Sequence, residues 1–216
     1  AGLQQSFVGI GKMALLRIVN NFGAAAVAAF TVAGRVDMFA AMPAMNFAAA
    51  LSTFVGQNIG ADKMSRVRKG LTSTFLMTSL ISLIVSALVV VFRYEIMAWF
   101  SKDMEVINIG AEYLLIVSMF YIVFSTMFVI GGVMRGAGDT LIPMFITLFA
   151  LWIIRIPLSW FLSEQIGITG IWWGVPAAWG TGMILSIIYY MTGRWKSKAV
   201  VKHDKEPKIP ENKIVS

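Results

Sequence analysis

Apolar residues fill most of the chain in long runs, and short polar or glycine-containing segments separate these runs. A helix needs roughly 20 apolar residues to cross the hydrocarbon core of a membrane. Six runs reach about this length and predict membrane-spanning helices at residues 1–22, 24–58, 71–93, 110–134, 140–162 and 168–193. The pattern therefore predicts an all-α integral membrane protein built as a bundle of six transmembrane helices.

The second run, 24–58, is longer than one straight span needs, and it contains Pro43. Because proline lacks the N–H that an unbroken helix uses, we expect this helix to begin outside the bilayer and to bend at Pro43. After residue 193 the sequence becomes polar and Lys-rich, a composition that favours disorder. We therefore divide the chain into a transmembrane lobe at 1–193 and a basic, disordered cytoplasmic tail at 194–216.

Lysine and arginine are unevenly distributed between the segments that flank the predicted spans. One set of segments holds Lys63, Arg66, Arg68 and Lys69 after the second span, Arg135 after the fourth, and the cations of the tail. The opposite set holds Arg93 and Lys102. Because cytoplasmic loops are enriched in Lys and Arg, the first set is predicted to be cytoplasmic, at a bacterial-type inner (plasma) membrane. The net charge of +7 then reflects topology and attraction to anionic lipid, and not nucleic-acid binding.

The composition excludes several kinds of chemistry. Cysteine is absent, so disulfides and thiolate metal sites are ruled out. The single histidine, His203, lies in the polar tail, and we find no nucleophile–base pair, phosphate-binding loop or metal-ligand spacing. We therefore expect neither an enzyme nor a resident metal or cofactor.

Polar and flexible side chains recur at helical spacing on three of the predicted spans. Lys12 and Arg17 share a face of the first span, and a methionine stripe follows Arg35 on the second. Such faces either line a cavity or pack against protein, because polar groups facing lipid are costly. We take the following residues as candidates for a substrate cavity: Gln5, Lys12, Asn20, Met38, Met42, Asn46, Tyr121 and Ser125.

Acidic residues are predicted to lie at the ends of the spans. Asp37, Glu95, Glu112 and Glu164 fall near outer ends, and Asp62 and Asp139 fall at inner ends. This placement predicts that the chain lacks a mid-membrane carboxylate to couple transport to protons or sodium. Arg155 lies inside the fifth span near Pro157, where it needs a partner or water and is placed to cap carbonyls that the proline leaves free.

Glycine clusters mark two close approaches of the backbone. The stretch GGVMRGAGDTLIP at 131–143 predicts a hairpin in which Gly136 and Gly138 adopt positive φ and Asp139 or Thr140 caps the next helix. We do not expect this stretch to touch a substrate. The run GIWWG at 170–174 is a GxxxG pattern, which predicts close packing of two helices.

Two stretches resemble a known family. They are AAVAAFTVAGRV at 25–36 leading to STFVGQNIGADKMSRVRKG at 52–70, and VMRGAGDTLIP at 133–143 followed by LWIIRIPLSWFL at 151–162. In this order they resemble the C-terminal half of multidrug and toxic compound extrusion (MATE) transporters, over nearly the whole chain except the tail. The resemblance implies that these are helices seven to twelve of a twelve-helix protein, whose N-terminal six-helix lobe is missing from this chain.

The resemblance also implies a branch and an activity. One branch of the family carries a glutamate in helix seven and an aspartate in helix ten, and neither acid is found here. The chain is therefore more similar to the DNA-damage-inducible branch, whose coupling aspartate lies in the N-terminal lobe. The implied activity is export of amphipathic, cationic drugs or metabolites in exchange for protons or sodium, with the ion gradient as the energy source and membrane lipid as the surroundings.

Three alternatives remain open from the residues. Lys12 and Arg17 discourage cations unless the other lobe supplies acids, so anionic or zwitterionic substrates stay possible. A lipid-linked precursor flippase of the related superfamily shares the fold and needs a basic cavity, which Lys12, Arg17 and Arg35 would suit. A non-transport membrane assembly subunit is the third reading, although the polar faces on three spans speak against it.

Overall fold

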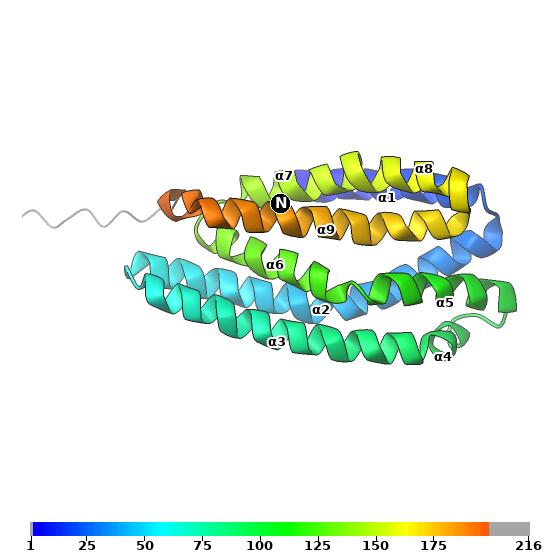
Figure 1. Ribbon diagram of the computed structural model, residues 1–216, viewed down its shortest axis with the longest axis horizontal. Helices are drawn as coiled ribbons and strands as arrows, with labels where there is room; N and C mark the ends of the chain where they lie inside the picture. Colours follow the sequence, from blue (N-terminus) through cyan, green and yellow to red (C-terminus); the bar gives the residue numbers. More distant parts are fainter. Residues whose placement is uncertain (1, 199–216) are drawn as a thin grey trace, which may run out of the picture.

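The computed structural model describes the backbone of residues 2–198 and the side chains of residues 6–196. The helices run along one long axis (Figure 1). In chain order they are α1 Gly2–Asn20, α2 Ala24–Gly60, α3 Met64–Val91, α4 Arg93–Ala98, α5 Met104–Ser118, α6 Tyr121–Gly136, α7 Leu141–Phe149, the π-helix η1 Ala150–Arg155, α8 Ile156–Ile166, α9 Ile168–Thr192 and the 3₁₀-helix η2 Arg194–Lys198. No strand is present within residues 2–198.

Each predicted span corresponds to a helix or to a joined set of helices. The span predicted at 110–134 is a pair, α5 and α6, bent by 51° where one helix ends and the next begins. By length and composition, α2, α3, α9 and the continuous segment Leu141–Ile166 can cross a membrane, and the bent pair adds a fifth span if its two helices together form one. The α1 helix carries Lys12 and Arg17 and does not meet the same criterion. The all-α membrane fold is therefore confirmed, and α2 continues through Pro43 as one helix.

The α6 helix holds the two sides of the lobe together. Figure 1 shows α1, α7, α8 and α9 on one side of α6, and α2 and α3 on the other. Contacts join α6 to α2 and α3 and also to α9, while α8 packs along α9. A packed interior thus runs along α6.

Glycines allow α2 and α6 to approach each other closely. A Cβ on Gly132 would lie 2.6 Å from the Ala48 carbonyl oxygen, and one on Gly136 would collide with the Ser52 carbonyl oxygen. The prediction of positive φ at Gly136 is wrong, because α6 continues through this residue and its role is proximity. Of Gly136 and Gly138, only Gly138 has a positive φ, of 88°, and the chain changes direction there.

Asp139 was predicted to cap the start of α7, but its main contact is a different one. Its Oδ1 accepts only a long bond from the Ile142 N–H at 3.5 Å, whereas Oδ2 accepts from the Tyr189 hydroxyl at 2.5 Å. Thr140 occupies the N-cap position without a side-chain bond. Asp139 therefore ties the hairpin to α9 more than it caps α7.

The GxxxG run packs closely against α8, as predicted. A Cβ on Gly170 would meet the backbone of Leu162, and a Cβ on Gly174 would meet the Ser159 hydroxyl and the Arg155 carbonyl oxygen at 3.2 Å. Trp172 between these glycines is fully buried, stacked on Phe30 at 5.8 Å. The two glycines thus bring α9 close to α8, and Trp172 packs α9 against α2.

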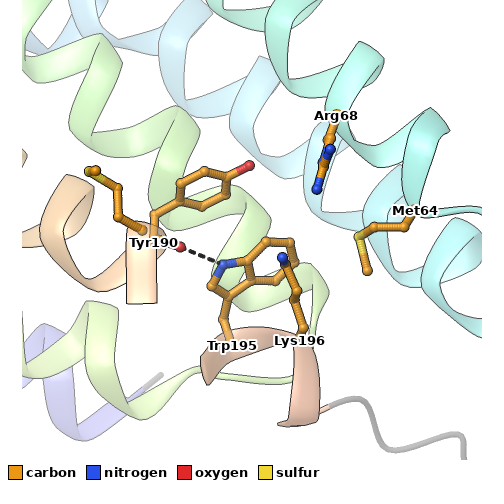
Figure 2. A pocket seen from close by; sticks show the side chains of 6 residues that line it. Met64, Arg68, Tyr190, Trp195 and Lys196 are labelled. Carbon is orange, nitrogen blue, oxygen red and sulfur yellow. Dashed lines mark hydrogen bonds between the residues drawn. The ribbon is translucent and has the colours of Figure 1, made fainter. Parts of the chain in front are cut away.

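The beginning of the predicted tail is ordered against the lobe. Trp195 is 1% exposed, stacks on Tyr190 with ring centroids 5.2 Å apart, and donates from Nε1 to the Tyr190 carbonyl oxygen at 2.9 Å (Figure 2). A cavity of about 250 Å³ beside it is lined by Met64, Arg68, Tyr190, Met191, Trp195 and Lys196. Residues 194–198 thus differ from the prediction of disorder because one large aromatic side chain anchors them, and 199–216 lie outside the described residues.

Candidate substrate cavity

A cavity of about 640 Å³ opens between α1, α2, α6, α7, η1 and α9. This volume lies within the range of pockets that hold drug-sized ligands. Its lining consists of Val8, Lys12, Met45, Ala49, Ser52, Phe124, Met127, Phe128, Arg135, Thr147, Ala150, Leu151, Arg155, Ala178 and Trp179. Contributions from this many elements mean that the whole packing of the lobe, and no single loop, shapes the cavity.

The charged part of the lining is entirely basic among the described residues. Lys12, Arg135 and Arg155 contribute positive charges, and no Asp or Glu belongs to the lining. Arg135 bends back along its own helix, because Nη2 donates to the Phe128 carbonyl oxygen at 3.4 Å. Gly131 leaves room for this conformation, since a Cβ there would lie 3.1 Å from Arg135 Nη1. This conformation places the guanidinium of Arg135 along α6 at the cavity lining.

Aromatic rings form the apolar part of the lining. The rings of Phe124 and Phe128 lie 4.3 Å apart, and Trp179 lies 5.0 Å from Phe124. Met45 and Met127 add flexible, polarizable side chains, which adapt to ligands of different shape. The cavity thus combines a basic side with an aromatic side.

Arg155 ends the π-helix η1, two residues before Pro157. A π-turn widens the helix, and such turns often occur at functional sites. Within the described residues the Nε of Arg155 is buried with no hydrogen-bond partner, and no bond to the carbonyls near Pro157 is present. The predicted capping role is therefore not seen, and the guanidinium is left with open donor capacity at the cavity.

A half-buried carboxylate, that of Asp37, lies near Arg155. The hydroxyls of Tyr113 and Tyr121 donate to the two oxygens of Asp37, at 2.5 Å and 2.7 Å respectively. The positive charge of Arg155 is close enough to act on Asp37 and on Tyr113. Asp37 is thus satisfied by neutral donors, and it offsets part of the charge of Arg155 from outside the cavity lining.

The structure gives Asp37 partners that its sequence position did not reveal. It lies more than a third of the way along the 37-residue α2, about 20 Å from its start. Because this helix was expected to begin outside the bilayer, the placement of Asp37 near the outer end of the span stays a prediction. Tyr113 and Tyr121 are eight residues apart in sequence. This spacing alone does not predict that both meet one carboxylate, because the bend between α5 and α6 lies between them.

The predicted cavity candidates are distributed over several environments. Lys12 lines the cavity. Met38, Met42 and Asn46 are exposed on α2 outside the lining, and Asn20 is exposed at the end of α1. Tyr121 is bound to Asp37, and Ser125 is fully buried with its hydroxyl donating to the Ile122 carbonyl oxygen at 3.0 Å. The side chain of Gln5 lies outside the described residues.

Several lining residues were not expected from the sequence. Arg135 was used only to orient the end of the fourth span, and Phe124, Phe128 and Trp179 were not among the candidates. Their common feature is that α6 and α9 turn them toward the same space, which no spacing within one helix reveals. Among residues 6–196, no group of three or more His, Asp or Glu residues could hold a metal ion.

Comparisons with known proteins agree with this architecture. The MatE family model matches residues 1–161. The probable multidrug resistance proteins YoeA and YpnP of Bacillus subtilis are 29% and 30% identical, over 94% and 91% of this chain and 44% of each relative. The crystal structure of the Vibrio cholerae MATE transporter VcmN in the bent form superposes with a TM-score of 0.84 at 20% identity, covering 91% of this chain and 44% of that one.

The fold and cavity define a helical membrane lobe that can enclose a small molecule. The family match extends over more than half of the residues. The chain therefore belongs to the MATE family, whose members are multidrug transporters and not enzymes. It spans less than half of the length of the relatives that it matches.

Proposed function

We propose that this chain is one half of a secondary active multidrug antiporter, which exports amphipathic compounds in exchange for protons or sodium. The observation that carries the proposal is the cavity of about 640 Å³, with a basic side and an aromatic side, in a lobe of the MATE fold. The coverage of about 44% of each relative supports a half-length unit. The gradient of the exchanged ion is the energy source.

We further propose that the chain is the C-terminal half of a member of the DNA-damage-inducible branch. The order of the stretches FVGQNIGA, RGAGDT and IRIP supports the C-terminal half. The absence of Asp and Glu from α1 supports the branch. The basic loops after α2 and α6 support an inner (plasma) membrane location with the C-terminus in the cytoplasm.

The basic lining bears on the charge of the substrate. Export of cations requires carboxylates outside this chain to offset Lys12, Arg135 and Arg155. Met38, Met42 and Asn46 on the exposed part of α2 are proposed to contact substrate only if the other half extends the cavity over them. The same three basic residues favour a second function, a flippase for lipid-linked precursors that carry phosphate.

A pair of adjacent alanines on α2 offers a test of the cavity. Ala49 lines the cavity, whereas Ala50 is exposed and does not. The full-length gene product and its Ala49→Trp and Ala50→Trp variants are produced in a bacterial strain without multidrug exporters, and efflux of amphipathic dyes of both charges is measured. Ala49→Trp should lower efflux about tenfold or more by filling the cavity, and Ala50→Trp should retain it. Equal efflux by both variants, at equal membrane abundance, would refute the assignment.

A further inference from the structure

We infer that the cavity binds amphipathic organic anions, with an acidic group at Arg155 and Lys12 and an aromatic body against Phe124 and Trp179. This inference rests on the proposed transport function, and it names the substrate class for the same cavity. It differs from the cationic substrates that the family resemblance implies. Three features point to this ligand class: the charge of the lining, the Nε of Arg155 without an acceptor, and the aromatic side.

The charge of the lining favours an anion. Three positive side chains border one space of about 640 Å³, and the lining described here contains no carboxylate. Asp37 lies behind Arg155 and offsets at most one of these charges, so the cavity remains net positive. A cleft of one charge sign with low-dielectric walls concentrates ions of the opposite sign. A cation bound there would be repelled, whereas an anion would neutralise the lining.

Arg155 is the specific contact that the acidic group of the ligand would use. A buried donor without an acceptor is costly, and a buried charge more so. The neighbouring carboxylate of Asp37 already accepts from Tyr113 and Tyr121, one hydroxyl on each oxygen. The Nε of Arg155 is left without an acceptor among the described residues. The Arg155 side chain also lines the cavity, so a carboxylate or sulfonate there would pair with the accessible part of its guanidinium and offset its charge.

The aromatic side would hold the body of the ligand. Phe124, Phe128 and Trp179 form a contiguous group of rings, with centroid distances of 4.3 and 5.0 Å. Rings stack on such surfaces with favourable energy beyond their burial. Met45 and Met127 next to the rings tolerate bodies of different shape. A planar aromatic anion therefore matches both sides of the cavity at once.

Two dyes with the same ring system and opposite charge test the inference. Fluorescein is an anion and rhodamine 123 is a cation, and both carry the tricyclic xanthene. We expect the full-length gene product to export fluorescein faster than rhodamine 123. Arg155→Met, which keeps a long apolar side chain, should lower fluorescein export on the order of tenfold, the loss expected for a hydrogen bond to a charged group. Arg155→Lys should restore part of it through charge alone.

Two further variants keep the test decisive if Arg155→Met fails to fold. Lys12→Met removes an exposed positive charge of the lining and should lower fluorescein export, whereas Arg93→Met removes a charge outside the cavity and should not. Faster export of rhodamine 123, unaffected by Lys12→Met, overturns the anion assignment and leaves the proposed transport function standing. Export of neither dye, with the protein present in the membrane, overturns both.

Discussion

At the scale of single residues, Asp37 shows how partners distant in sequence change the meaning of a side chain. The acid itself is evident from the sequence, but Tyr113 and Tyr121 come from α5 and α6, more than 70 positions away. Together the two hydroxyls and the charge of Arg155 make burial of the carboxylate tolerable. An unpaired carboxylate at this place would be strongly destabilising, so the hydroxyls are structural groups first.

Removal of either hydroxyl should therefore destabilise the lobe. We expect Tyr113→Phe and Tyr121→Phe each to lower the free energy of unfolding by about 1.5–3 kcal/mol, the range for hydrogen bonds to charged groups. Tyr94→Phe is the control, because Tyr94 is exposed and forms no hydrogen bond to Asp37. Thermal unfolding in detergent measures the effect. In the Asp37→Asn background the loss on Tyr→Phe should shrink, and an undiminished loss there would contradict the assigned bonds.

At the scale of elements, the contact between α2 and α6 depends on the absence of side chains. Gly132 and Gly136 place the backbone of α6 against the carbonyl oxygens of Ala48 and Ser52. The sequence predicted a special role for Gly136, but a glycine signals either positive φ or close approach, and only the packing distinguishes them. The sequence also did not predict the π-helix η1, because ALWIIR at 150–155 has the composition of an ordinary apolar α-helix.

A methyl group at this contact should separate the two helices. Gly136→Ala puts a Cβ against the Ser52 carbonyl oxygen and 2.8 Å from the Cβ of Val55, so we expect a loss of about 1–3 kcal/mol in unfolding free energy. Gly180→Ala on α9 is the matched control, because a Cβ there meets nothing within 4 Å. Because alanine has a higher helix propensity than glycine, Gly180→Ala should leave the unfolding free energy unchanged or raise it by up to about 1 kcal/mol. Equal destabilisation by both variants in a thermal unfolding assay would contradict the close contact.

At the scale of the whole molecule, periodicity predicted more of the fold than of the cavity. All six apolar runs are helical, because each run must satisfy its own backbone hydrogen bonds in a membrane, but α3 and α5 begin six or seven residues earlier than expected and the fourth run is broken into α5 and α6. The cavity brings together residues from six elements, and of its basic residues only Lys12 was expected there, from one helical face. Arg155 was expected to need a partner or water, but its position near Asp37 depends on how η1 packs, which the spacing along one helix does not encode.

Transport should also require more than this chain. A central site in transporters of this kind lies between two repeated units that rock against each other, so one lobe offers only one wall. We therefore expect liposomes that contain residues 1–216 alone to release a loaded xanthene dye no faster than empty liposomes when an ion gradient is imposed. The full-length gene product, reconstituted at the same protein-to-lipid ratio, should release it faster, and its Ala49→Trp variant should not. Gradient-driven release by residues 1–216 alone would mean that two copies of this lobe can form the alternating cavity, and the half-unit proposal would then be replaced by a homodimer.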